Sequence, residues 1–148
     1  MNLGTLFKID VSAYANWAAG FGLTGSSAAP NADPDGDRLP NGVEFVVGGN
    51  PTTPAVAGSP SISPGAANMI FTFSRIDASE SSDVTLTVET STDLVTWPTI
   101  FTIGATTATS SPGVSISENG AGPDTITVAI PIGPEPKKFA RLKASIGG

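Results

Sequence analysis

Asn31-Ala-Asp-Pro-Asp-Gly-Asp-Arg-Leu-Pro-Asn-Gly-Val-Glu44 is the most informative stretch in this chain of 148 residues. When Asp33 is counted as position 1, side chains that carry oxygen stand at positions 1, 3, 5, 9 and 12. They are Asp33, Asp35, Asp37, Asn41 and Glu44. Leu39 stands at position 7, where only its backbone carbonyl offers an oxygen. A tightly coiled loop turns every second side chain toward its centre, so these oxygens are expected to converge.

This spacing of oxygen donors is that of an EF-hand-type calcium loop, in which position 7 contributes a carbonyl and position 12 a bidentate Glu. Ca²⁺ is a hard cation that takes about six to eight oxygens. Three crowded carboxylates would repel one another without a cation. We therefore predict that Ca²⁺ is bound by Asp33, Asp35, Asp37, Leu39, Asn41 and Glu44.

One position of the loop departs from the EF-hand pattern. Position 6 is normally Gly because the loop turns sharply there, but this chain has Arg38. A non-Gly residue with positive φ costs about 1–2 kcal/mol. A register that starts at Asn31 would place Gly36 at position 6, but Gly42 would then replace the carboxylate at position 12. We prefer the first register because five matching ligand types outweigh one backbone penalty. The alternative is a solvated acidic turn, since Asp, Gly, Asn and Pro are common in loops.

The composition of the chain narrows the classes of function. Cys and His are both absent, which removes disulfides, the usual zinc ligands and the usual general base. The net charge of −6 argues against a nucleic-acid surface. No apolar run is long enough to suggest a membrane span. No nucleophile–base pair is visible, so we predict that the chain is not an enzyme. Two carboxylates that converge in space, as in glycosidases, remain the alternative.

Residues 12–50 show helical patterns on both sides of the acidic loop. Ser12 is a suitable N-cap, and Gly22 a suitable C-terminal stop, for a first helix. Residues 41–47 are expected to form a second helix that ends at Gly48. We therefore predict a helix–loop–helix around the ion. Residues 1–11 alternate weakly and are expected to form an N-terminal strand or arm.

The remainder of the chain is predicted to be a β-sandwich. Residues 51–67 carry four prolines and are expected to be a linker before a domain over residues 68–148. Apolar residues then alternate with polar ones in six short segments. They are Met69, Phe71 and Phe73; Val84, Leu86 and Val88; Phe101 and Ile103; Val114 and Ile116; Ile126, Val128 and Ile130; and Ala140, Leu142 and Ala144. Turn residues separate them, which indicates a mainly β fold with an antiparallel, immunoglobulin- or fibronectin-like β-sandwich.

Two segments together resemble a module of large secreted bacterial proteins. One joins Trp17-Ala-Ala-Gly-Phe-Gly-Leu23 to the acidic loop, and the other is Thr87-Val-Glu-Thr-Ser-Thr-Asp-Leu-Val-Thr-Trp97 with Lys138-Phe-Ala-Arg-Leu-Lys143. The acidic loop is also similar to dockerin and thrombospondin type 3 repeats. In those secreted proteins the module forms a C-terminal region beyond catalytic or adhesive domains. The resemblance implies a non-catalytic role in attachment, display or assembly, in a secreted or cell-surface setting of a bacterium.

We therefore expect a calcium-stabilised, extracellular structural module that serves surface attachment or self-assembly, including assembly as a filament subunit. The expected partner is another copy of the chain or another cell-surface component. The apolar segment Leu3–Val11 is a candidate for addition to a neighbouring sheet. The alternative is a carbohydrate-binding module of a secreted enzyme. Such modules bind glycans through exposed aromatic residues, whereas Trp97 is expected in the core on base rates.

Overall fold

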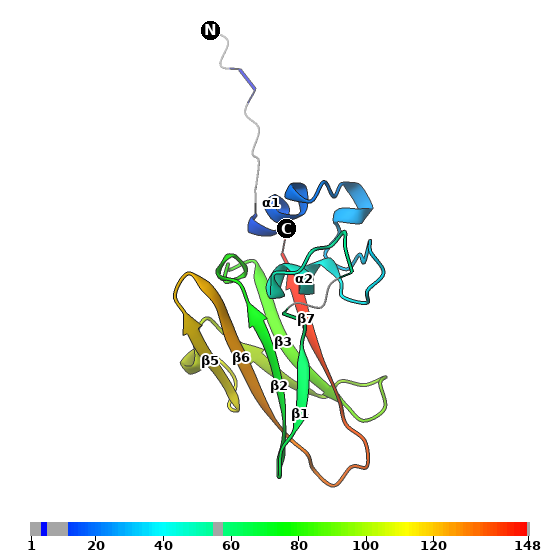
Figure 1. The fold of residues 1–148 in the computed structure, drawn as a ribbon, viewed down its shortest axis with the longest axis vertical. Helices are drawn as coiled ribbons and strands as arrows, with labels where there is room; N and C mark the ends of the chain where they lie inside the picture. Colours follow the sequence, from blue (N-terminus) through cyan, green and yellow to red (C-terminus); the bar gives the residue numbers. More distant parts are fainter. Residues whose placement is uncertain (1–3, 6–11, 55–57, 148) are drawn as a thin grey trace.

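The protein is mainly β, with two antiparallel sheets and two short α-helices at one end of them (Figure 1). The computed structural model describes residues 4–5, 12–54 and 58–147. The prediction of a strand or arm over residues 1–11 falls almost wholly outside these ranges. Among the described residues, no helix has the length and apolar character needed to cross a membrane.

The sheets contain seven strands among the described residues. The first sheet has the order β1–β2–β6–β5, formed by β1 (Ser61–Pro64), β2 (Asn68–Arg75), β5 (Val114–Asn119) and β6 (Gly122–Pro131). The second has the order β4–β3–β7, formed by β3 (Val84–Ser91), β4 (Thr99–Ile103) and β7 (Phe139–Ile146). Every neighbouring pair is antiparallel. All six strands that the alternating pattern predicts are present.

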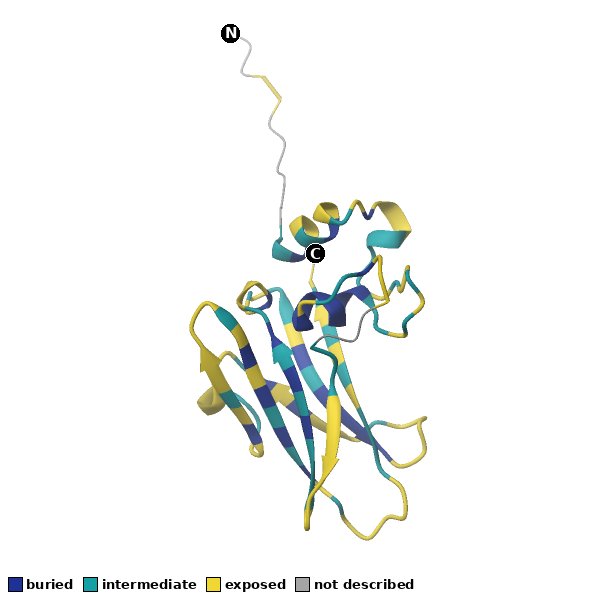
Figure 2. Cartoon of the chain, in the orientation of Figure 1, coloured by how far each residue is buried: buried dark blue, intermediate teal, exposed yellow. Residues whose placement is uncertain are grey.

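One hydrophobic core lies between the two sheets. Phe71 and Ile126 from the first sheet belong to the same buried cluster as Val88 and Ile103 from the second. Figure 2 shows the cause: buried residues alternate with intermediate ones along β2, and with intermediate or exposed ones along β6. Full burial of one such side chain contributes about 1.5–3 kcal/mol relative to exposure. Two sheets packed over a common core are consistent with a β-sandwich.

The proline-rich stretch contains a strand that the alternating pattern did not predict. Residues of β1 pair with β2, from Ser61 opposite Thr72 to Pro64 opposite Met69. All four side chains of β1 are exposed, so the strand carries no period of apolar and polar residues. Proline is tolerated because an edge strand can leave one side of its backbone unpaired. The interpretation of residues 51–67 as linker therefore needs correction at residues 61–64.

The two helices begin and end where the sequence indicates. In α1 (Ala13–Gly20), the Ser12 hydroxyl accepts a hydrogen bond from the backbone N–H of Ala15 at 3.0 Å. After α1, Gly22 has a φ of 73° and the N–H of Leu23 donates to the carbonyl of Ala18, which is a Schellman ending. Helix α2 (Asn41–Val47) ends at the left-handed Gly48. Short 3₁₀ turns occur at η1 (Gly25–Ala28), η2 (Asp77–Ser79) and η3 (Thr107–Thr109).

Helix α2 joins the N-terminal region to the sheets. All seven of its residues are buried. Val46 and Val47 belong to the core between the sheets. Phe45 packs instead in a second cluster with Tyr14 and Trp17, and its ring centroid lies 5.6 Å from each of theirs. The helix therefore holds the acidic loop, which directly precedes it, against the body of the protein.

Candidate metal centre

The acidic loop brings three carboxylates together. One carboxylate oxygen from each of Asp33, Asp35 and Asp37 lies within 4.8 Å of the others. Backbone hydrogen bonds to these side chains coil the loop: Asp33 accepts from the N–H groups of Gly36 and Arg38, at 2.9 and 3.0 Å. Asp35 Oδ1 accepts from Asp37 N, and Asp37 Oδ1 from Leu39 N. Such side-chain turns are why Asp is favoured in tight loops. They leave the second oxygens of Asp35 and Asp37 unbonded.

Arg38 occupies the position at which the loop turns sharply. Its φ is 77°, in the left-handed region that the pattern reserves for glycine. This conformation costs about 1–2 kcal/mol in a residue with a β-carbon. The hydrogen bond from Arg38 N to Asp33 helps to hold it. The turn is therefore formed at position 6 in spite of the arginine.

The loop continues directly into α2, whose first turn supplies two further predicted ligands. Asn41 and Glu44 are both fully buried. The amide nitrogen of Asn41 donates to the carbonyls of Ser27 and Ala29, at 2.8 and 3.0 Å. This leaves Asn41 Oδ1 as the free end of the amide. Leu39 packs its side chain against the core between the sheets, which anchors the loop between these ligands.

Electrostatic repulsion is concentrated at Glu44. Burial, followed by the charges of Asp35, Asp37 and Asp33, raises the pKa of Glu44 from 4.5 to about 7. Burial also raises the pKa of Asp35, with a contribution from Asp37. The Glu44 carboxyl is therefore close enough to the three Asp side chains for their negative charge to disfavour its ionised form. A positive ion among these groups would remove the repulsion.

The same residues hold buried oxygens that have no hydrogen-bond partner. Five such oxygens occur on four of the predicted ligands: Asp35 Oδ2, Asp37 Oδ2, Asn41 Oδ1, Glu44 Oε1 and Glu44 Oε2. A buried polar group without a partner costs about 1–3 kcal/mol, so native proteins keep few of them. Within the described part of the chain, the other buried side-chain atoms of this kind are Ser59 Oγ and Arg75 Nε. Five of these seven unsatisfied atoms therefore belong to the predicted ligands, although Glu44 is not among the three acids whose oxygens lie within 4.8 Å of one another. Oxygens are the donor atoms that a hard cation takes.

The acidic loop is not flanked directly by two helices, as the predicted helix–loop–helix requires. Helix α1 ends at Gly20, and the 3₁₀ turn η1 together with an irregular segment lies between it and Asp33. Only the outgoing helix α2 adjoins the loop. Helix α1 instead packs on α2 from the side, through Tyr14 and Trp17.

A second group of acids, which sequence reasoning missed, is organised around an arginine. Glu80, Glu118 and Asp124 lie near one another, and the buried Arg75 bonds Asp124 at 2.9 Å and pairs with Glu80. Burial opposes ionisation of Asp124, but hydrogen bonds from Arg75 and from the Asn119 N–H hold its pKa below the usual range. Arg75 also donates to the Gly104 carbonyl at 2.7 Å. The guanidinium already supplies positive charge here, so we interpret this group as a structural ion-pair network.

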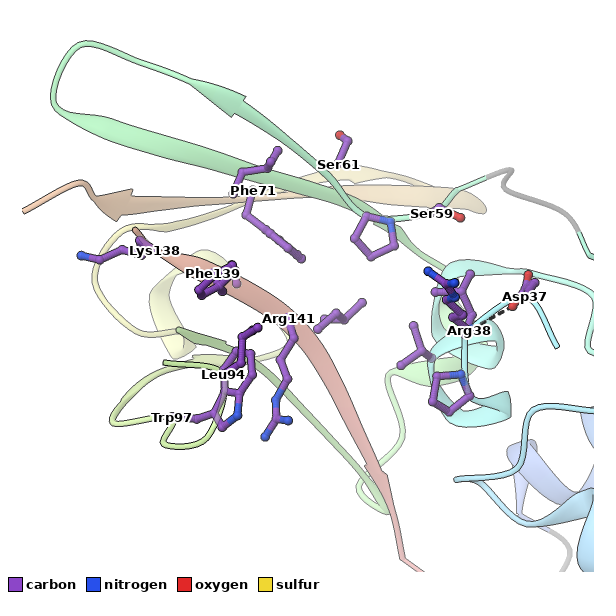
Figure 3. Close-up of a pocket in the computed structure, with 17 residues that line it drawn as sticks. Asp37, Arg38, Ser59, Ser61, Phe71, Leu94, Trp97, Lys138, Phe139 and Arg141 are labelled. Atoms are coloured by element: carbon purple, nitrogen blue, oxygen red, sulfur yellow. Dashed lines mark hydrogen bonds between the residues drawn. The ribbon is translucent and has the colours of Figure 1, made fainter. Parts of the chain in front are cut away.

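A groove of about 690 Å³ lies between β1 and β7 (Figure 3). Trp97 lies in it and is half-buried, so the expectation of a core indole was wrong. The guanidinium carbon of Arg141 stands 3.9 Å from the centroid of the Trp97 ring, which covers one face of the indole. That face is not open to a sugar ring. No residue near Trp97 in the sequence signals this partner, because it comes from β7.

Comparison of the chain with protein-family models, curated proteins and solved structures finds no match. The resemblance to modules of secreted bacterial proteins therefore rests on the two sequence segments that carry it. The candidate metal centre rests on its own residues and geometry.

Proposed function

We propose that this chain is a non-catalytic structural module stabilised by one Ca²⁺ ion. The ion is bound by Asp33, Asp35, Asp37, Leu39, Asn41 and Glu44. The observation that carries the proposal is the set of five buried oxygens without hydrogen-bond partners. These oxygens belong to side chains that the loop spacing singles out independently of any structure.

The donor set favours calcium over other biological cations. Every donor is oxygen, and the chain has no His or Cys to attract zinc or copper. Mg²⁺ usually keeps several waters and is bound through one or two carboxylates. Four carboxylates, one amide and one carbonyl from a coiled loop form the fuller cage that Ca²⁺ takes. Glu44 suits the bidentate role because both of its oxygens are unbonded.

Calcium would stabilise the fold through α2. The ion neutralises the repulsion among the four carboxylates and fixes the loop that leads into this helix. Sites in extracellular modules have dissociation constants near 10⁻⁴ M. At millimolar calcium, a site of this affinity raises the free energy of unfolding by about 1.4 kcal/mol. Because such calcium levels occur outside cells, we place the module in a secreted or cell-surface setting of a bacterium. Its role there is surface attachment or self-assembly.

We further propose that the β-sandwich is of the immunoglobulin type. The order β1–β2–β6–β5 corresponds to strands A, B, E and D of that fold. The order β4–β3–β7 corresponds to strands C′, C and F. The chain crosses between sheets after β2, β4 and β6, as the immunoglobulin order requires.

Thermal unfolding in millimolar Ca²⁺ and in EDTA tests the calcium proposal. We expect calcium to raise the melting temperature of the wild type by about 3–6 °C, which corresponds to the gain above for a chain of this size. Glu44→Gln should lose most of this response because it removes the bidentate ligand. Glu118→Gln is the matched control, since it removes an exposed acid from the second acidic group, and it should respond as the wild type does. An equal response in wild type and Glu44→Gln, or none in either, would contradict the proposal.

A further inference from the structure

The strand order leaves one position of the sandwich open. In an immunoglobulin-type sandwich a strand G pairs with strand F, on the side away from strand C. Here β7 takes the place of F and pairs with β3. Within residues 4–5, 12–54 and 58–147, no strand pairs with the other side of β7, and β1 has β2 as its single partner strand. The groove of Figure 3 lies between these two edges.

From this geometry we infer that the groove takes up residues 3–11 of a second copy of the chain as an added strand. The inference rests on the assembling role and on the immunoglobulin-type order proposed above. It does not rest on occupancy of the calcium site.

The groove is lined by apolar side chains, some buried and some partly or fully exposed, beside which an eighth strand would lie. Phe71 of β2 and Phe139 of β7 lie on facing sides of it in Figure 3. Leu142 of β7 and Val43 of α2 line it further along. Ile62 of β1 also lines it and is 50% exposed. Large apolar side chains at an open sheet edge are typical of sites of strand addition.

A rigid turn presents more apolar surface at the rim of the groove. Leu94 lines the groove with a positive φ of 63° and is 57% exposed, and its neighbour Val95 is 80% exposed. The turn is held by Asp93, whose carboxylate accepts hydrogen bonds from the N–H groups of Val95 and Thr96, each at 2.8 Å. These bonds hold the pKa of Asp93 well below its usual range. Strained backbone fixed in this way, with apolar side chains in solvent, is common at binding sites.

Residues 3–11 have the pattern of a strand with one apolar face. The odd positions are Leu3, Thr5, Phe7, Ile9 and Val11. The even positions include Lys8 and Asp10. An added strand of this kind turns its odd residues into the groove and its charged residues to solvent. Nine extended residues span about 30 Å, which is sufficient to run beside the eight residues of β7.

An added strand that is antiparallel to β7, as strand G is to strand F, must come from another copy. Ile146, at the end of β7, packs in the same cluster as Ala13 at the start of α1. A strand antiparallel to β7 would finish with residue 11 beside Phe139, about 23 Å from Ile146. Consecutive Cα atoms are only about 3.8 Å apart, so residue 11 of the same chain cannot lie there. A second copy can reach this place, and its body then lies beyond the Phe139 end.

Charge does not oppose a second copy. Three cations, Arg38, Lys138 and Arg141, line the groove with one acid, Asp37, but Arg141 pairs with Glu89 and Lys138 with Glu135. The entering segment carries Lys8 and Asp10, whose charges cancel. Contact between residues 3–11 of one copy and the groove of the next copy is a heterologous interface, because the two surfaces differ. Such an interface builds a filament unless the rotation between copies closes a ring.

Cross-linking between copies tests the inference, because the natural chain has no cysteine. Lys8→Cys and Lys143→Cys chains are mixed in calcium and treated with a short bis-maleimide. In an added antiparallel strand, Lys8 lies on the solvent side beside Arg141 or Lys143, within reach of this linker. We expect a mixed cross-linked dimer. Lys8→Cys mixed with Ser117→Cys, an exposed site on the opposite edge strand β5, should give at most a tenth as much.

Assembly of the full chain provides a second readout, by sedimentation and electron microscopy. Ile9→Asp should reduce assembly at least tenfold because it places a charge in the apolar groove. Lys8→Asp introduces the same acid on the solvent side and should assemble far better than Ile9→Asp. Equal assembly of the two variants would overturn the inference. So would cross-linking within single chains of a Lys8→Cys/Lys143→Cys double variant.

The remaining outcomes separate this inference from the calcium proposal. Absence of the mixed cross-link, together with a calcium-dependent melting temperature, would overturn the strand exchange and leave the calcium site intact. Binding of polygalacturonate that is lost in Arg141→Ala, with no cross-link, would assign the groove to an acidic polysaccharide instead. A cross-link that persists when no variant responds to calcium would support the exchange and contradict the calcium proposal alone.

Discussion

Arg75→Met is expected to lower the free energy of unfolding by about 3–5 kcal/mol. Arg75 is 3% exposed and its partner Asp124 is 1% exposed. Removal of the guanidinium leaves the Asp124 carboxylate buried without its counter-charge, and it also removes the donor to the carbonyl of Gly104. Urea unfolding followed by circular dichroism measures the loss.

Two further variants show whether buried charge is the cause of this loss. Asp124→Asn in the Arg75→Met background should recover part of the stability, because the uncompensated charge is then gone. Lys138→Met breaks the pair with the exposed Glu135, whose atoms are 3.7 Å apart, and a hydrogen bond to the Pro131 carbonyl, and should cost about 0–1 kcal/mol. If Arg75→Met costs no more than Lys138→Met, the ion-pair network is not a structural element of the core.

Without calcium, the protein is expected to lose stability as the pH rises from about 4.5 to about 7. Glu44 has a raised pKa of about 7 in the folded protein and an ordinary value near 4.5 when unfolded. Between these values the folded state binds more protons than the unfolded state, so the free energy of unfolding falls with rising pH and then levels off. The difference is on the order of 3 kcal/mol. The stabilisation from protonated Glu44 is therefore present at low pH and lost through pH 7.

Urea unfolding in EDTA at pH 5 and at pH 8 measures this change. Glu44→Gln, which carries no titrating group at this position, should show a much smaller difference between the two pH values. Excess calcium at pH 8 should offset the loss in the wild type, because the ion replaces the proton among the carboxylates. A calcium-free wild type that is as stable at pH 8 as at pH 5 would show that the pKa of Glu44 is not raised in the folded protein.

The fold was predictable wherever the sequence carries a period. The six strands with alternating apolar residues are present, α1 follows its expected N-cap Ser12, and α2 ends at the expected Gly48. Strand β1 was missed because Ser61–Pro64 is exposed on every side chain and therefore lacks any period. Its only cue is its position before β2, across a short turn in which the N–H of Gly65 donates to the Asn68 carbonyl. The shared core of α2 and the sheets was also not visible in the pattern.

For the candidate site, the local arrangement of ligands was predictable, but contacts between distant residues were not. Ligand spacing is local, so the convergence of Asp33, Asp35 and Asp37 follows from the loop itself. The identity of the ion remains a prediction. Contacts between residues far apart in the sequence gave no signal: Arg75 and Asp124 are 49 residues apart, and Trp97 meets Arg141 from another strand. In the sequence, an isolated charged residue of this kind is indistinguishable from a surface residue, because its partner lies on another strand.

Calorimetric titration of Ca²⁺ into EDTA-stripped protein at pH 7.5 tests the central claim most directly. We predict one ion bound per chain, and at least a tenfold loss of affinity in an Asp35→Asn/Glu44→Gln double variant. Both substitutions preserve the shape of the side chains and remove only their charge. Binding that is absent in the wild type, or that is unchanged in the double variant, would contradict the assignment of the acidic loop as a calcium site.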